Sequence, residues 1–153
     1  MKTLTTFLIL LTIFSGCSSK NAFDKFAFSS TRELSEDSIS STKLLKDKKV
    51  EGLVTAIYLN KVLPDIYNDK EYFYIYMYDK EKANQVNFLL NDKAASNVKE
   101  LPAQNQFTYL TSFEANWSQY YLVSFEKDEK NKLRLEVITD KEAKAAFVFV
   151  KDK

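Results

Sequence analysis

The chain of 153 residues contains no histidine and a single cysteine, Cys17. Without histidine it cannot form a Ser-His-Asp or Cys-His catalytic arrangement or a histidine-ligated zinc site. It also lacks the side chain best suited to proton transfer near neutral pH. Catalysis would have to depend on carboxylates, Lys, Tyr or Ser, and the sequence distinguishes no pair of carboxylates. We therefore predict that the protein is not an enzyme and holds no cofactor and no metal ion.

Glycine and proline are also scarce, with two of each. Sharp turns must therefore use Asn, Asp and Lys. There is no glycine-rich loop to hold a phosphate and no nucleophile elbow. Neither sign of charge is in excess, because 22 basic and 21 acidic side chains give a formal net charge of +1. Such a balanced chain has no field that attracts nucleic acid, so we expect no nucleic-acid partner.

The N-terminal apolar run is too short to cross a bilayer, which takes about 20 residues. It extends from Phe7 to Phe14, after the basic Lys2 and before two small residues. This layout predicts an export signal over residues 1–16 that is removed from the mature protein. Its removal takes away Lys2 and no acidic side chain, which leaves 21 basic and 21 acidic residues.

The segment ends in Phe14-Ser15-Gly16-Cys17, which resembles the lipobox of bacterial lipoproteins. It departs from the family pattern at Phe14, where Leu, Val or Ile is commoner. The resemblance implies a diacylglycerol thioether on Cys17, cleavage after Gly16, and a further acyl chain, such as palmitate, on the new amino terminus. Two or more acyl chains hold a protein stably at a membrane. The alternative is an ordinary secretory signal followed by an incidental cysteine.

The resemblance implies a location, and together with the length and pattern of the remaining chain it predicts a domain organisation. Residues 17–30 would form a lipidated tether and residues 31–153 a single β-rich domain, anchored in the cell envelope outside the cytoplasm. In enteric bacteria an aspartate after the cysteine tends to hold lipoproteins at the inner membrane. Ser18 therefore favours the outer membrane, on the periplasmic route, if two membranes are present.

Alternating apolar and polar residues predict strands along the mature chain. The expected strands cover residues 50–59, 71–79, 85–91, 106–114, 119–127, 132–138 and 147–150, and those at 119–127 and 132–138 are expected to form a hairpin. Asn91-Asp92 resembles an N-cap, which predicts a short helix that ends before Pro102. Brief helices are also considered at 32–46 and from Asp140.

These elements predict a β-rich α+β fold with one short helix between strands 3 and 4. One candidate is a small OB-like barrel, since closure would protect the sheet edges. The other is an antiparallel sheet of five to seven strands with the helix packed on one face.

A row of four tyrosines is the most unusual pattern in the predicted domain. The row comprises Tyr72, Tyr74, Tyr76 and Tyr78. Alternate residues of a strand share one face, with rings about 7 Å apart. Such a face suits a sugar, a peptide segment or another protein. Alternatively, the tyrosines form a second, half-buried layer beneath the N-terminal segment or the last helix, because tyrosine is common in strands for packing reasons.

Two further motifs carry weaker signals. The loop 64–71 contains three carboxylates, and calcium prefers ligands of this type. The loop lacks the residue spacing of an EF-hand, so we interpret it as a solvated turn. Asn116-Trp117-Ser118 is an Asn-x-Ser sequon with Glu114 two places before the asparagine. It is similar to the extended acceptor of some bacterial N-glycosylation systems, which makes Asn116 a candidate modification site.

The sequence thus favours a membrane-anchored envelope lipoprotein that binds another envelope component, a protein or a glycan, without catalysis. One alternative is a structural or assembly subunit of a secretion or surface apparatus. Another is a carboxylate-dependent hydrolase of wall polymers.

Overall fold

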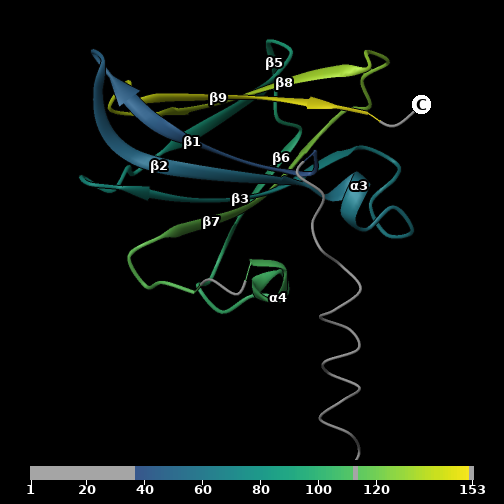
Figure 1. Ribbon diagram of the computed structural model, residues 1–153, viewed down its shortest axis with the longest axis horizontal. Coiled ribbons are helices and arrows are strands. Elements are labelled where there is room, and N and C mark those ends of the chain that lie inside the picture. Colours follow the sequence, from purple (N-terminus) through teal and green to yellow (C-terminus); the bar gives the residue numbers. More distant parts are fainter. Residues whose placement is uncertain (1–36, 112–113, 152–153) are drawn as a thin grey trace, which may run out of the picture. The chain divides into compact units, whose positions relative to one another are not determined.

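Nine strands form one antiparallel sheet in the computed structural model, which describes residues 37–111 and 114–151. The strands are β1 (Ile39–Lys46), β2 (Lys49–Tyr58), β3 (Glu71–Asp79), β4 (Val86–Leu90), β5 (Lys93–Ala94), β6 (Asn97–Leu101), β7 (Gln119–Phe125), β8 (Lys132–Thr139) and β9 (Lys144–Val150). Their order is β5-β4-β8-β9-β1-β2-β3-β7-β6, and the sheet curls into a half-barrel (Figure 1). Two helices, α3 (Leu59–Val62) and α4 (Thr108–Thr111), have four residues each. The β-rich antiparallel class is therefore confirmed.

Several predictions concern residues outside this description. They are the export signal over 1–16, the lipidation of Cys17 and the tether over 17–30. In the part of the chain that the structure describes, no helix has the length and apolar character needed to cross a bilayer.

Tight turns are made by residues other than glycine, as the composition predicted. Asp47 and Lys48 join β1 to β2 with φ values of 48° and 66°. Asn91 and Asp92 join β4 to β5 with φ values of 48° and 69°. Two consecutive residues with positive φ are typical of a type I′ hairpin, in which Asn and Asp are favoured. The Asn91-Asp92 pair is thus a hairpin turn, and the prediction that it caps a helix is wrong.

The segment predicted as a helix after this turn contains the short strands β5 and β6. The Ala95 N–H donates to the Phe88 carbonyl on β4 (3.1 Å), and the Ser96 N–H donates to the Ser124 carbonyl on β7 (2.8 Å). The chain therefore crosses from β4 to β7 within two residues. This crossing connects β5 to β6, the strands at the two ends of the sheet order. Ladder hydrogen bonds from both neighbours outweigh the weak helical spacing of a few apolar residues, so the helix between strands 3 and 4 is not confirmed.

The prediction of five to seven strands is not confirmed either, because segments read as helical or irregular add strands. β1 occupies most of the segment considered as a helix at 32–46, and β9 begins at Lys144, where the brief helix from Asp140 was expected. Conversely, α4 lies within 106–114, which was predicted as a strand. The hairpin predicted from 119–127 and 132–138 is wrong, because β7 pairs with β3 and β6 whereas β8 pairs with β4 and β9.

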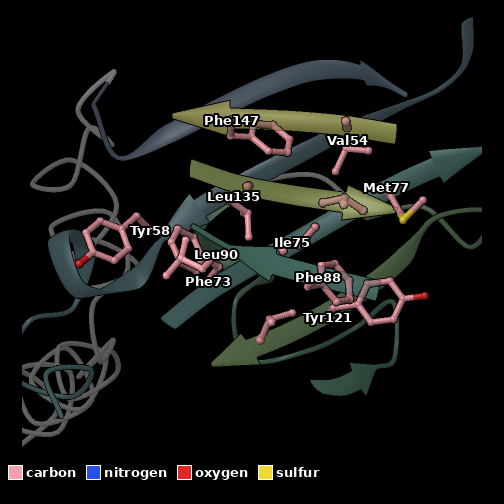
Figure 2. Close-up of a cluster of buried hydrophobic side chains, with 14 of the residues drawn as sticks. Val54, Tyr58, Phe73, Ile75, Met77, Phe88, Leu90, Tyr121, Leu135 and Phe147 are labelled. Atoms are coloured by element: carbon pink, nitrogen blue, oxygen red, sulfur yellow. The ribbon is translucent and has the colours of Figure 1, made fainter. Parts of the chain in front are cut away.

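Two apolar clusters lie on opposite faces of the sheet. The larger cluster fills the inside of the curl, where Phe88 of β4 and Tyr121 of β7 meet with ring centroids 5.2 Å apart (Figure 2). The smaller cluster lies on the outer face of β2, β3 and β7, where Tyr74 and Tyr120 pack with Phe107. The segments around α3 and α4 thus cover part of the outer face.

Candidate functional site

A hollow of about 320 Å³ opens where β2 ends and β3 begins. Aromatic and amide side chains on its wall are those of Tyr58, Tyr67, Asn60 and Asn68. Charged side chains on its wall are those of Lys61, Lys127, Lys151 and Glu71. These residues come from the end of β2, from α3 and the loop after it, from the start of β3, and from the segments that follow β7 and β9.

The loop that forms one wall is held in place by Asn60 of α3. Its side-chain amide donates to the Lys70 carbonyl (2.6 Å), and its oxygen accepts from the Tyr72 N–H (2.8 Å). Leu63 closes the short helix with a bond from its N–H to the Leu59 carbonyl (2.7 Å). The short helix α3 follows directly after β2. The two hydrogen bonds of Asn60 therefore hold the loop at the start of β3, beside Tyr58.

Glu71 is a buried carboxylate at the base of this arrangement, with 1% of its surface exposed. The Tyr58 hydroxyl donates to its Oε2 (2.6 Å), and the Asp128 N–H donates to its Oε1 (3.1 Å). The Lys151 ammonium also bonds to Oε1 and to the Asp128 carbonyl. A buried charge is tolerated when it is paired and hydrogen-bonded in this way. Both oxygens of the Glu71 carboxylate therefore accept hydrogen bonds from the protein itself.

Three lysines, Lys61, Lys127 and Lys151, lie on the wall. The Lys127 ammonium donates to the Asn68 carbonyl (3.2 Å), a bond that leaves further donors on the same group. The charges of Lys151 and Glu71 offset each other, because the two groups form an ion pair.

Local hydrogen bonds and burial shift the pKa values of ionisable groups near the hollow. An exposed ion pair joins Lys70 to Glu126 (2.7 Å), and its hydrogen bond raises the pKa of Lys70 and lowers the pKa of Glu126. The Lys130 N–H lowers the pKa of the Asp128 carboxyl, with a smaller contribution from the Asn91 amide. Partial burial raises the pKa of Tyr67.

The tyrosine row shares the outer face of β3, and the loop that carries α4 covers its middle. Tyr74 is fully buried, with its ring 4.9 Å from that of Phe107 and its hydroxyl accepting from the Asn105 amide (3.3 Å). Burial raises the pKa of Tyr74 to about 12. Tyr72 and Tyr76 are half-buried, and Tyr78 is 42% exposed. Binding by this row stays a prediction, but Tyr74 is packed away from the surface.

The other predicted motifs are scattered. In loop 64–71 the carboxylates diverge, since Asp69 accepts from the Tyr72 hydroxyl (3.0 Å) while Glu71 is buried beside Lys151. Within residues 37–111 and 114–151 there is no group of three side chains suited to hold a metal ion. Asn116 lies on an exposed turn closed by a bond from the Ser118 N–H to the Ala115 carbonyl (3.0 Å).

The sequence reasoning missed the Glu71–Lys151 pair, although the pattern contains a signal for it. Glu71 is in phase with the core-facing residues Phe73 and Ile75 of β3, and Lys151 is in phase with the core-facing Phe149 of β9. A charged residue in a core-facing position at a strand end indicates a buried partner.

Comparison with known proteins found no family model that matches the chain and no curated protein with significant similarity.

Proposed function

We propose that this chain is a bacterial envelope lipoprotein, held at a membrane through lipid on Cys17, whose domain binds another envelope component without catalysing a reaction. The observation that carries the binding role is the hollow beside Glu71. Its volume of about 320 Å³ lies at the lower end of the range typical of small-molecule sites and would take one or two sugar units or a short peptide segment.

The arrangement at Glu71 supports binding over catalysis. A general acid or base must reach a proton on its substrate within hydrogen-bond distance. The Glu71 carboxylate instead accepts from Tyr58, Asp128 and Lys151, so it is committed to holding the fold. The absence of histidine points in the same direction.

Photo-crosslinking from the rim of the hollow tests the binding role. A photoreactive residue would replace Asn68, which is exposed and lines the hollow, in the full chain in living cells. A matched control would replace Asn87, which is exposed on β4 away from this wall. We expect an adduct with one envelope protein or glycan from position 68 and none from position 87. Adducts of equal yield at both positions, or none at position 68, would reject the hollow as the binding site.

Metabolic labelling tests the anchor separately. A fatty-acid analogue should label the wild-type chain and place it in the membrane fraction, whereas Cys17→Ala should carry no label. An unlabelled wild-type chain would overturn lipidation.

A second candidate role, assembly into a larger envelope structure, is favoured by one apolar pair. Leu53 of β2 and Tyr78 of β3 are cross-strand partners on the outer face, and 57% and 42% of their surfaces are exposed. Two adjacent exposed apolar side chains suit a protein contact. Stoichiometric co-purification of another protein from detergent, lost in Leu53→Asp but retained in Lys99→Asp, would favour this role.

A further inference from the structure

We infer that an exposed patch beside the turn between β1 and β2 binds an anionic lipid surface. This inference rests on the proposed membrane anchor, and it adds a second contact between the domain and the same bilayer. The strand register places six exposed residues together on the outer face of the sheet. They form what we call the hairpin patch: Leu45, Val50, Leu53, Tyr78, Lys43 and Lys144.

The apolar part of the hairpin patch is continuous across three strands. Leu53 on β2 is the cross-strand partner of Tyr78 on β3, and Leu45 on β1 is the partner of Val50 on β2. Between 39% and 57% of the surface of each of these four residues is exposed. Farther along the same strands, the segments around α3 and α4 cover part of the outer face. The apolar side chains of the hairpin patch have no such cover.

Unpaired lysines border these apolar residues. Lys43 is the cross-strand partner of Leu53, and Lys144 is the partner of Leu45. The turn between β1 and β2 adds two more exposed lysines, Lys48 and Lys49. In the part of the chain that the structure describes, none of these four lysine side chains takes part in an ion pair or a hydrogen bond.

The carboxylates nearby do not offset this charge. Three of them lie around a separate hollow with two lysines, namely Glu51, Asp79 and Glu81 with Lys46 and Lys141. That group has one negative charge in excess, which is balanced by Lys80, whose ammonium donates to the Val50 carbonyl (2.5 Å). Asp47 in the turn and Glu142 before β9 remain. Four lysines against two carboxylates leave two uncompensated positive charges at the hairpin patch.

An anionic bilayer surface satisfies both parts of the hairpin patch. Its apolar side chains can enter the boundary between headgroups and acyl chains, while the lysine stems lie along apolar surface and place their ammonium groups among the phosphates. Each lysine near an anionic surface strengthens binding by a factor of about five. Because the lipid on Cys17 would keep the domain close to the bilayer, a weak contact is sufficient to orient it.

The chain between the anchor and the domain is long enough for this contact. Residues 18–36 can span up to roughly 65 Å, about twice the length of the ten-residue strand β2. The hairpin patch can therefore reach the bilayer that holds Cys17. The hollow beside Glu71 lies at the other end of β2, near α3 (Figure 1). It would stay clear of the lipid and accessible to a partner.

Vesicle flotation of the full Cys17→Ala chain tests the inference without the acyl chains, which would enter any bilayer. One set of vesicles contains phosphatidylcholine alone, and the other an equal mixture of phosphatidylcholine and phosphatidylglycerol. We expect binding to the mixed vesicles to be at least about tenfold tighter, and to weaken as salt is added.

Variants matched in charge locate the contact. Lys43→Gln combined with Lys144→Gln removes two lysines from the hairpin patch and should weaken binding to the mixed vesicles by roughly 25-fold, a factor of about five for each. Lys99→Gln combined with Lys132→Gln removes the same charge from exposed positions on β6 and β8 and should leave the affinity unchanged. All variants carry residues 1–16, so any contribution of that segment cancels in the comparison.

An apolar pair of variants tests the other half of the hairpin patch. Leu53→Gln should lower the affinity for the mixed vesicles, whereas Ile66→Gln, which is 67% exposed in the loop after α3, should not. Equal unfolding midpoints of all the variants would show that they are folded.

Equal binding to both kinds of vesicle, or full affinity after loss of Lys43 and Lys144, would overturn the inference. Leu53-dependent co-purification of another protein, without vesicle binding, would also overturn it and identify the hairpin patch as a protein contact. If Cys17 carries the fatty-acid label but the vesicles do not bind, the anchor stands and only the lipid contact is rejected. If Cys17 is unlabelled while the mixed vesicles bind with the expected lysine dependence, the lipid contact stands and the anchor is rejected.

Discussion

At the residue scale, Glu71 is the side chain on which both the hollow and the C-terminal end of the domain depend. Its carboxylate joins Tyr58 at the end of β2 to Lys151 after β9. Glu71→Gln keeps the volume but removes the charge, so the Lys151 ammonium loses its carboxylate and keeps the Asp128 carbonyl. We expect the free energy of unfolding to fall by about 3 kcal/mol, the lower end of the range for broken buried pairs, because Lys151 is only partly buried. Urea unfolding would measure this loss.

The exposed carboxylate nearby provides a matched control. Glu126 pairs with Lys70, but 73% of its side chain is exposed. Glu126→Gln should therefore change the free energy of unfolding much less than Glu71→Gln does. Equal losses in the two variants would contradict a special role for Glu71.

A second prediction at the residue scale concerns the ionisation of Tyr74 and Tyr121. Burial raises the pKa of Tyr74 to about 12, and burial raises the pKa of Tyr121 to about 12 as well. A raised folded-state pKa means that stability is fully present below the unfolded pKa of about 10 and is lost as pH rises towards 12. Phenolate absorbance should show these two groups titrating late, near pH 12. Tyr74→Phe should remove one of the late-titrating groups. An unchanged late phase in Tyr74→Phe would contradict the prediction.

At the scale of the element, Gly52 allows β2 and β3 to approach closely. A methyl group on its Cα would lie 2.0 Å from the Tyr78 carbonyl oxygen and 3.1 Å from the Asp79 Cα. These are backbone atoms of the paired strand, so they can move apart only by distorting the ladder. Gly52 is also opposite Leu44, where the register of β1 shifts.

Gly52→Ala should therefore lower the free energy of unfolding by about 1–3 kcal/mol, the usual cost of overpacking. Thermal or urea unfolding would measure it. Glu51→Ala, at the preceding half-exposed position, should cost less than about 0.5 kcal/mol. A Gly52→Ala domain as stable as Glu51→Ala would contradict the close approach.

Strands were predicted correctly where burial imposes a clear alternation of residues along the chain. Prediction failed where pairing with neighbouring strands determines the secondary structure. The strand predicted at 71–79 is β3, because its residues alternate between two covered faces. The segment 92–101 shows a few apolar residues at helical spacing, yet β4 and β7 draw it into two short strands. Local spacing does not reveal such pairing, because register depends on the partner strand.

At the scale of the whole molecule, the hollow is assembled from residues that are distant in the chain. Tyr58, Glu71 and Lys151 meet only because β2, β3 and the end of β9 converge at one end of the sheet. The sequence places each of them on a core-facing position of its own strand. It does not specify which strands become neighbours, so neither the ion pair nor the hollow could be predicted. The tyrosine row, by contrast, was visible because it lies within one strand.

The pH dependence of the stability of the fold follows from which ionisable side chains the chain contains and from their pKa values. The chain has no histidine, so no side chain with an ordinary pKa near 6.5 titrates in the neutral range. The pKa values of Asp128 and Glu126 are lowered in the fold. A lowered folded-state pKa means that their stabilisation is present above the unfolded value of about 4 and is lost as pH falls through the folded value.

The urea midpoint should accordingly stay level from about pH 6 to 8, fall below about pH 4, and fall again above about pH 10 as the buried tyrosines ionise. Asp128→Asn should flatten the acid limb, because the carboxyl that accepts from the Lys130 N–H and the Asn91 amide no longer titrates. A step in stability between pH 6 and 8 would contradict this account, because it would require a strongly perturbed group within the fold that these contacts do not provide.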